Sequence, residues 1–206
     1  MNNNLLSIAR ASVFFEKSVF FFSYLLTSNI NFLIFFIGHY FNNIINKILK
    51  YNILLPIFKK KNIPIIGMGV RPKGAKNCCL FLPCKKKYPK YPKSYGMPSG
   101  HSQSIAFFST LCILTLINSK NKYIIKIIGI FILSFCILFV MYSRIIFKCH
   151  TINQTILGSF IGFILAYYLY KKKNTIKKNI LKIKNSELFL FIFSLLLIIF
   201  NFIMFK

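Results

Sequence analysis

The sequence predicts an all-α, polytopic integral membrane protein, a bundle of five or six transmembrane helices. Three observations lead to this prediction: 56% of the 206 residues are hydrophobic, 25 of them are Phe, and several apolar runs continue almost without interruption. These runs are about twenty residues long, the length that spans a bilayer as a helix. Since no soluble segment separates them, we expect a single membrane domain over residues 1–206.

The first predicted elements follow the apolar runs in order. We expect the first span at Val19–Phe41, with Asn29 and Asn31 near its middle. His39, at the end of this span, is interpreted as a solvated interfacial residue without a catalytic role. Lysines and a proline interrupt Ile44–Phe58, so this segment is either a short, tilted second span or an amphipathic helix at the interface.

Four further spans are predicted after a basic loop at Lys59–Lys93. Their apolar runs are Ile105–Ile117, Tyr123–Tyr142, Thr151–Tyr170 and Leu188–Phe205. A polybasic connector, Lys171–Lys184, joins the last two. This loop and this connector are predicted on opposite faces and are both basic, so charge does not decide which side of the membrane each face occupies.

The scarcity of acidic residues limits the possible chemistry. The chain has 28 Lys and Arg but only two acids, Glu16 and Glu187, at opposite ends of the sequence. Paired-carboxylate hydrolysis, two-metal phosphoryl chemistry and Mg²⁺ or Ca²⁺ cages all require several carboxylates in one place. We therefore expect no metal and no cofactor. The net charge of +26 reflects overuse of Lys along the whole chain, so it does not predict nucleic-acid binding.

The six cysteines lack the spacing of a zinc site. Three lie in or beside apolar segments and are interpreted as small hydrophobic residues: Cys112, Cys136 and Cys149. The other three share the basic loop and are interpreted as unpaired thiols, unless that loop faces an oxidising lumen: Cys78, Cys79 and Cys84.

A polar stretch with two glycines leads directly into the apolar run that begins at Ile105. It reads Tyr95-Gly96-Met97-Pro98-Ser99-Gly100-His101-Ser102-Gln103. The proline and glycines favour a tight turn and Ser99 can cap a helix, so the N–H groups of the first helical turn form an anion site. His101 adds a group that can give or take a proton near neutral pH.

The predicted topology brings more polar residues to the same membrane face. The span after His101 crosses away and the next span returns, so Ser143 and Arg144 emerge beside His101. The link from there to His150 is too short to cross, and Arg71 lies in the loop that leads to the turn. Two guanidiniums opposite a helix N-terminus can hold phosphate oxygens. One imidazole can then attack phosphorus while the other protonates the leaving oxygen and later activates water.

These residues resemble the three signature motifs of the type 2 phosphatidic acid phosphatase (PAP2) superfamily. The matching motifs are Arg71-Pro72, then Pro98-Ser99-Gly100-His101, then Ser143-Arg144 followed by His150. The resemblance covers most of Gly69–Tyr170. Two longer stretches are most similar to the dolichyldiphosphatase branch: Tyr95 to Gln103, and Tyr142-Ser143-Arg144 with His150-Thr151, Gln154 and Gly158.

The resemblance implies a role for each matching position. It implies that His150 is the nucleophile, which forms a phosphohistidine, and that His101 is the general acid. It also implies a phosphate cradle of Arg71, Ser99, Gly100 and Arg144. Gln154 stands where the superfamily commonly has an Asp. It lies one helical turn after His150, where its carbonyl can accept a hydrogen bond from Nδ1.

One position departs from the superfamily pattern. The first motif usually begins with a Lys seven residues before the Arg, and here that position is Pro64. Lys61, Lys73 or Lys76 could supply the charge instead, and the sequence does not decide among them.

The resemblance implies hydrolysis of a lipid phosphate or diphosphate at the membrane interface. A polyprenyl diphosphate such as dolichyl diphosphate is the leading substrate, and phosphatidic acid or another lipid monophosphate is the second candidate. A catalytically silent membrane protein that keeps the fold is the third, and the missing lysine at Pro64 supports it. A multi-pass membrane location is implied, with the endoplasmic reticulum as a candidate. Nothing in the sequence predicts the oligomeric state.

Overall fold

The computed structural model describes residues 3–58, 62–63, 67–72, 75, 95–182 and 188–196. Its helices are α1 (Asn3–Thr27), α2 (Ile30–Ile48), the π-helical segment η1 (Leu49–Leu54), α3 (Leu55–Phe58), α4 (Gly100–Ile117), α5 (Tyr123–Ile146) and α6 (Ile152–Leu181). Residues 188–196 are also helical. Two short strands, β1 (Asn62–Ile63) and β2 (Gly67–Met68), pair antiparallel. The all-α class is confirmed.

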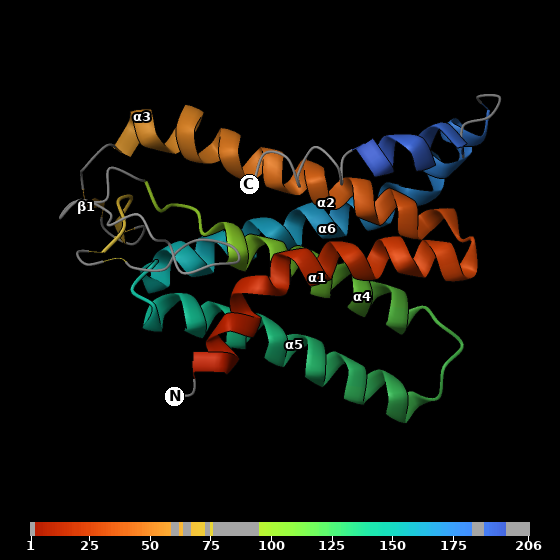
Figure 1. Ribbon diagram of the computed structural model, residues 1–206, viewed down its shortest axis with the longest axis horizontal. Coiled ribbons are helices and arrows are strands. Elements are labelled where there is room, and N and C mark those ends of the chain that lie inside the picture. The colour runs from red at the N-terminus through yellow and green to blue at the C-terminus, as the bar shows by residue number, and fades with distance from the viewer. Residues whose placement is uncertain are drawn as a thin grey trace.

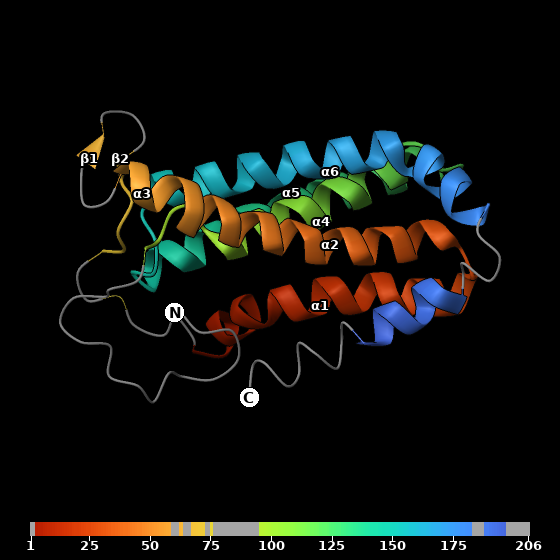
Figure 2. The ribbon, with the colours of Figure 1, turned by 90° about the horizontal axis from the view of Figure 1, so that it is seen from above.

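Helix α4 lies at the centre of the bundle. It packs most extensively on α6 and also contacts α1, α2 and α5. The long helices run roughly along one axis, and the N-termini of α4 and α6, the C-terminus of α5, and α3 lie at the same end (Figures 1 and 2). The turns that carry the sequence motifs therefore meet at one end of the bundle, as the predicted topology requires.

The predicted first span is wrong. Val19–Phe41 is divided between α1 and α2 by a turn in which Ser28 has φ 51°. Asn29 then caps α2, because its side-chain oxygen accepts the N–H of Asn31 at 3.0 Å. Asn side chains compete with the helical hydrogen-bond pattern and favour helix starts. The polar residues in the middle of this apolar run thus mark a helix boundary.

The alternatives for Ile44–Phe58 are also wrong. This segment is neither a separate span nor an interfacial helix, because it continues α2 through η1 and α3, and Ile30–Ile57 forms one candidate span of 28 residues. In η1 the N–H of Leu55 bonds to the carbonyl of Lys50, five residues back. A π turn of this kind accompanies Pro56, whose ring would clash with the preceding turn of a regular α-helix.

The later spans follow the prediction more closely. Ile105–Ile117 and Tyr123–Tyr142 lie within α4 and α5, and α6 continues past Tyr170 through most of the predicted connector. Within the described residues, four helices are long and apolar enough to cross a membrane: Ile30–Ile57, Gly100–Ile117, Tyr123–Ile146 and Ile152–Leu181. The predicted span Leu188–Phe205 is described only over 188–196. Beyond that it lies outside the described residues.

Glycines let α6 approach α4 closely. A methyl group on Gly158 would lie 2.5 Å from the carbonyl oxygen of Ser99, and one on Gly162 would collide with the carbonyl oxygen of Gln103. Small residues allow such close backbone packing between membrane helices. This contact fixes the start of α6, which carries the third motif, against the start of α4.

A buried polar cluster joins α1, α2 and α4. Oε2 of Glu16 lies 3.2 Å from Nε2 of His39. The Ser104 hydroxyl donates to the same carboxylate oxygen at 2.6 Å and lies 3.1 Å from Nε2 of His39. His39 is fully buried, so its interpretation as a solvated interfacial residue is wrong. The His39 side chain contacts Glu16 of α1 and Ser104 of α4. Hydropathy alone does not reveal these contacts.

Candidate active site

The motif turn forms the N-terminus of α4. Ser99 caps the helix as predicted: its hydroxyl oxygen accepts the N–H of Ser102 at 3.5 Å and the hydroxyl of Ser102 at 3.0 Å. The N–H of Ser99 donates to the carbonyl of Gln154 at 3.0 Å, which ties the turn to α6. Gly100 is the first residue of the helix. The N–H groups of this turn provide the positive end of the helix dipole.

His150 and Gln154 are held together at the start of α6. His150 is 4% exposed, and its Nδ1 lies 3.0 Å from the side-chain oxygen of Gln154. Thr151 and Gln154 form a capping box, in which each side chain accepts the backbone N–H of the other. The side-chain nitrogen of Gln154 donates to the carbonyl of Val70 at 2.9 Å. Gln154 therefore connects His150 to the segment that carries Arg71.

The segment before Arg71 is held against the motif turn. Val70 pairs with Tyr95 in an antiparallel bridge, and the N–H of Gly96 donates to the carbonyl of Gly69 at 2.8 Å. A methyl group on Gly96 would lie 2.5 Å from Oε1 of Gln154 and 3.0 Å from Cγ of Arg71. Only glycine leaves room for this approach. The close packing places Arg71 next to the Gln154 that binds His150.

Arg144 lies in the last turn of α5 and is fully buried. Its guanidinium carbon is 5.3 Å from the centre of the Phe147 ring, a cation–π distance. Its carbonyl accepts the N–H of Cys149 at 3.0 Å and that of His150 at 3.3 Å. The short turn between α5 and α6 is thereby folded around Arg144, and this brings the nucleophile candidate back to the same face.

The interpretation of Cys149 as a small hydrophobic residue is wrong, because this residue is disulfide-bonded. Its partner is neither Cys112 nor Cys136, which are free. The three cysteines of the basic loop lie outside the described residues. Nothing in its sequence context distinguishes Cys149 from Cys112 and Cys136.

The charges of Arg71, Arg144 and Lys50 act on both imidazoles. Burial of His150, followed by the charges of Arg71 and Lys50, holds the pKa of His150 well below its ordinary value; the charge of Arg144 acts in the same direction, and the hydrogen bond from Gln154 opposes it. The same three cations and His150 act electrostatically on His101. The structure thus brings together all the residues that sequence analysis placed at the site.

His101 lies in the first turn of α4. Its side chain is 9% exposed, and its Nε2 is buried without a hydrogen bond to any residue in the described part of the chain. A proton donor to a substrate needs such an atom. Within the described ranges, no group of three or more His, Cys, Asp or Glu could hold a metal ion.

Comparison with known families decides the classification. Residues 43–178, more than half of the chain, match the family model described as the PAP2 superfamily. This protein belongs to the PAP2 superfamily. The matched residues contain every position that resembled the three PAP2 motifs, so the family suggested by those motifs is confirmed.

Two curated relatives match the PAP2 region in part. A protein of Dictyostelium discoideum named Dolichyldiphosphatase 1 is 40% identical over 81 residues, which are 38% of this chain and 35% of that protein. A protein of Rhinolophus ferrumequinum with the same name is 33% identical over 92 residues, 41% of this chain and 39% of that protein. The chain therefore matches less than half of each relative. No solved structure matches significantly.

Sequence analysis gave no role to three residues that lie near the PAP2 motif turn: Asn42, Asn46 and Lys50. Gln103 donates from its side-chain nitrogen to the side-chain and backbone oxygens of Asn42, at 2.9 and 3.0 Å, and accepts from Asn46 at 2.7 Å. Asn42, Asn46 and Lys50 recur every four residues, so they form one stripe along α2 and η1. The four-residue spacing can be read from the sequence. That the stripe packs against Gln103 of α4 cannot.

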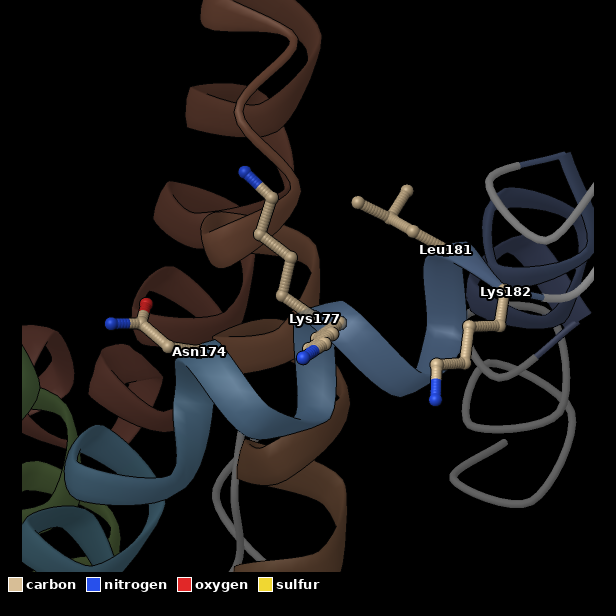
Figure 3. A pocket seen from close by; sticks show the side chains of 5 residues that line it. Asn174, Lys177, Leu181 and Lys182 are labelled. Atoms are coloured by element: carbon tan, nitrogen blue, oxygen red, sulfur yellow. The ribbon is translucent and has the colours of Figure 1, made fainter.

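A shallow pocket also lies away from the PAP2 motifs. Asn174, Lys177, Lys178, Leu181 and Lys182 line it near the C-terminal end of α6 (Figure 3), at the other end of that helix from His150. Its labelled lysine side chains point in different directions. Because they do not converge on a common point and the described residues that line the pocket include no acid, we assign no chemistry to it.

Proposed function

We propose that this protein is a metal-independent lipid phosphatase that acts through a phosphohistidine on His150, with a polyprenyl diphosphate as its leading substrate. The observation that carries the proposal is the meeting of His150, His101, Arg71, Arg144 and the N-terminus of α4 at one end of the bundle. These groups supply a nucleophile, a proton donor and an anion cradle without any carboxylate.

The hydrogen bonds of Gln154 assign the tautomer of His150. Because the side-chain nitrogen of Gln154 donates to the carbonyl of Val70, its oxygen is the atom that faces His150. Nδ1 of His150 must then carry the proton, which leaves the lone pair on Nε2. The nucleophilic atom is therefore Nε2, and its lowered pKa keeps it unprotonated at neutral pH.

In the first step, Nε2 of His150 attacks phosphorus and forms a P–N bond. The P–O bond to the leaving group breaks, its electron pair stays on the leaving oxygen, and His101 donates a proton to that oxygen. Arg71, Arg144 and the N–H groups of the α4 start hold the nonbridging oxygens. They stabilise the negative charge that spreads over these oxygens in the transition state.

In the second step, water hydrolyses the phosphohistidine. His101, now neutral, removes a proton from the water as the water oxygen attacks phosphorus. The P–N bond breaks, its electron pair returns to Nε2 of His150, and inorganic phosphate leaves. Both residues then have their starting protonation states, so the cycle needs no metal and no cofactor.

The chemistry of the leaving group favours a diphosphate. Cleavage of a diphosphate expels a phosphate monoester, which needs less protonation than the alkoxide expelled from phosphatidic acid. A histidine pair with Gln154 in place of a carboxylate suits this less demanding step. The name Dolichyldiphosphatase 1 of both relatives agrees with this choice. A multi-pass location in the endoplasmic reticulum membrane and a single domain over residues 1–206 belong to the same proposal.

Competition between two lipids tests this proposal. Purified protein is given dolichyl diphosphate and phosphatidic acid in one mixed micelle, and the release of phosphate from each is followed. We expect a higher kcat/KM for the diphosphate, with His150→Ala as the inactive control. A clear preference for phosphatidic acid would favour the second candidate, and no release from either lipid would favour a catalytically silent protein.

A further inference from the structure

Lys50 is a buried lysine beside the candidate active site. It lies in η1 and is 8% exposed. It follows Asn42 and Asn46 on the polar stripe, both of which bind Gln103 of α4. Asn46 already reaches the start of α4, since a methyl group on Gly100 would lie 3.3 Å from its side-chain oxygen. The next position on the stripe, Lys50, therefore lies beside the N-terminal end of α4.

A second contact fixes η1 at this end of the bundle. The hydroxyl of Tyr95 donates to the carbonyl of Leu54 at 3.1 Å. Tyr95 begins the motif stretch that ends in the cap of α4 and is itself paired with Val70, next to Arg71. The π-helical segment is thus attached to both halves of the phosphate cradle. Single π turns of this kind often occur at functional sites.

The charge of Lys50 has no protein counterion in the described part of the chain. No hydrogen bond or ion pair to its ammonium occurs there, and the one described carboxylate, Glu16, binds His39 and Ser104 instead. With the residue only 8% exposed, much of the hydration of this charge is lost, which is unfavourable unless an anion replaces it. Lys50 lies close enough to Arg71 for the two charges to interact, and both act on His150. Lys50 and Arg144 are buried and Arg71 is partly buried. Three cations that act on one histidine can form a site for a multiply charged anion.

We propose that Lys50 is a phosphate-binding residue, whose ammonium donates to a nonbridging oxygen of the phosphoryl group held by Arg71, Arg144 and the start of α4. This inference rests on the proposed function, which supplies that phosphoryl group. Lys50 then provides from η1 the cation that the superfamily motif places at the position of Pro64. Pro64 and the three lysines first considered, Lys61, Lys73 and Lys76, lie outside the described residues.

Binding of inorganic phosphate and of orthovanadate tests this role without turnover. Vanadate adopts the five-coordinate geometry of phosphoryl transfer and should bind all the cations of the cradle. We expect Lys50→Gln to weaken binding of both anions by about 10-fold or more, the loss typical of a hydrogen bond to a charged group. Lys47→Gln is the matched control, because Lys47 is exposed in the last turn of α2. It should change binding by less than about 2-fold.

Anion affinity in Lys50→Gln equal to that of the unsubstituted protein would overturn the inference. If wild-type protein binds both anions with Lys50-dependent affinity but releases no phosphate from lipids, the proposed function fails and the anion site stands. If lipids are hydrolysed and Lys50→Gln binds the anions normally, the inference alone fails.

A labelling experiment on unsubstituted protein covers the case in which Lys50→Gln does not fold. Lysines are methylated with formaldehyde and a borohydride, with and without phosphate, and the modified residues are located by mass spectrometry. Phosphate should protect Lys50 and leave the labelling of Lys47 unchanged. Equal labelling of Lys50 with and without phosphate would contradict its assignment.

Discussion

Nδ1 of His150 lies 3.0 Å from the side-chain oxygen of Gln154, and the same amide donates to the carbonyl of Val70 at 2.9 Å. The Gln154 side chain thus orients the ring of His150 and connects it to Val70, the residue before Arg71. A carboxylate at this position would add a negative charge among the cations of the site. The amide keeps the hydrogen bond without that charge.

Gln154→Ala should lower kcat about 10- to 100-fold, the usual effect of losing a residue that orients a reactive histidine. KM should change much less, because the cradle itself is intact. Steady-state kinetics on the preferred lipid measures both. Gln154→Glu retains an acceptor and serves as the matched variant, which should keep more activity. A kcat unchanged in Gln154→Ala would show that the contact is only structural.

His150→Ala should reduce turnover by at least about 1,000-fold, because the variant lacks the atom that forms the P–N bond. The fold should remain intact. Phosphate release and the thermal melting curve check the two parts of this prediction. His39→Ala is unsuitable as a control because it disrupts a buried pair, so the exposed Lys148→Ala is used. Phosphate release by His150→Ala at the rate of the unsubstituted protein would contradict the mechanism.

Arg144→Lys should reduce kcat about 100-fold or more, although lysine is common elsewhere in the chain. A guanidinium offers two parallel donors to phosphate oxygens, whereas an ammonium acts as a point charge, so the loss falls on the transition state. The kinetic constants are compared with those of Lys148→Gln, an exposed neighbour in the α5–α6 turn. Near-normal turnover would mean that Arg144 only anchors the end of α5.

The acid limb of kcat/KM should lie below pH 6.5, the ordinary pKa of histidine. Burial and the charges of Arg71 and Lys50 lower the pKa of His150, so the ring stays neutral as the pH falls and is protonated only at a lower pH. Lys50→Gln removes one cation, which raises this pKa and moves the acid limb to higher pH. A pH profile in which both proteins lose activity at the same point would contradict this assignment.

Activity should survive prolonged treatment with EDTA. The proposed steps use two imidazoles and cationic donors, and none requires a Lewis acid. The measurement is phosphate release before and after chelation and dialysis. Loss of activity that added Mg²⁺ restores would count against the mechanism.

The motif residues could be predicted because their signals are local. Ser99 caps α4 from the position where a proline- and glycine-containing turn meets an apolar run, and Gln154 reaches His150 because they lie one helical turn apart. The meeting of Arg71, His101 and Arg144 followed from counting crossings of the membrane. Each of these inferences needs only sequence spacing and the number of spans.

Other features depend on contacts between distant residues and could not be predicted. Ser28 and Asn29 end one helix and start another, yet hydropathy treats the surrounding run as continuous. His39 was interpreted as interfacial because its partners, Glu16 and Ser104, are far away in sequence. Gln103, which shows where the polar stripe of α2 packs, lies 57 residues beyond Asn46. Only the packed bundle reveals which helix face each of them occupies.

The cluster of Glu16, His39 and Ser104 shows that residues before the family match also pack against the helix that carries His101. The match begins at residue 43, whereas Glu16 and His39 precede it and hold Ser104, one helical turn after the proposed acid His101. A fragment cut at the edge of the family match would lose both partners and leave the Ser104 hydroxyl facing an apolar gap. Glu16 of α1 and His39 of α2 therefore help to hold the turn of α4 that carries His101.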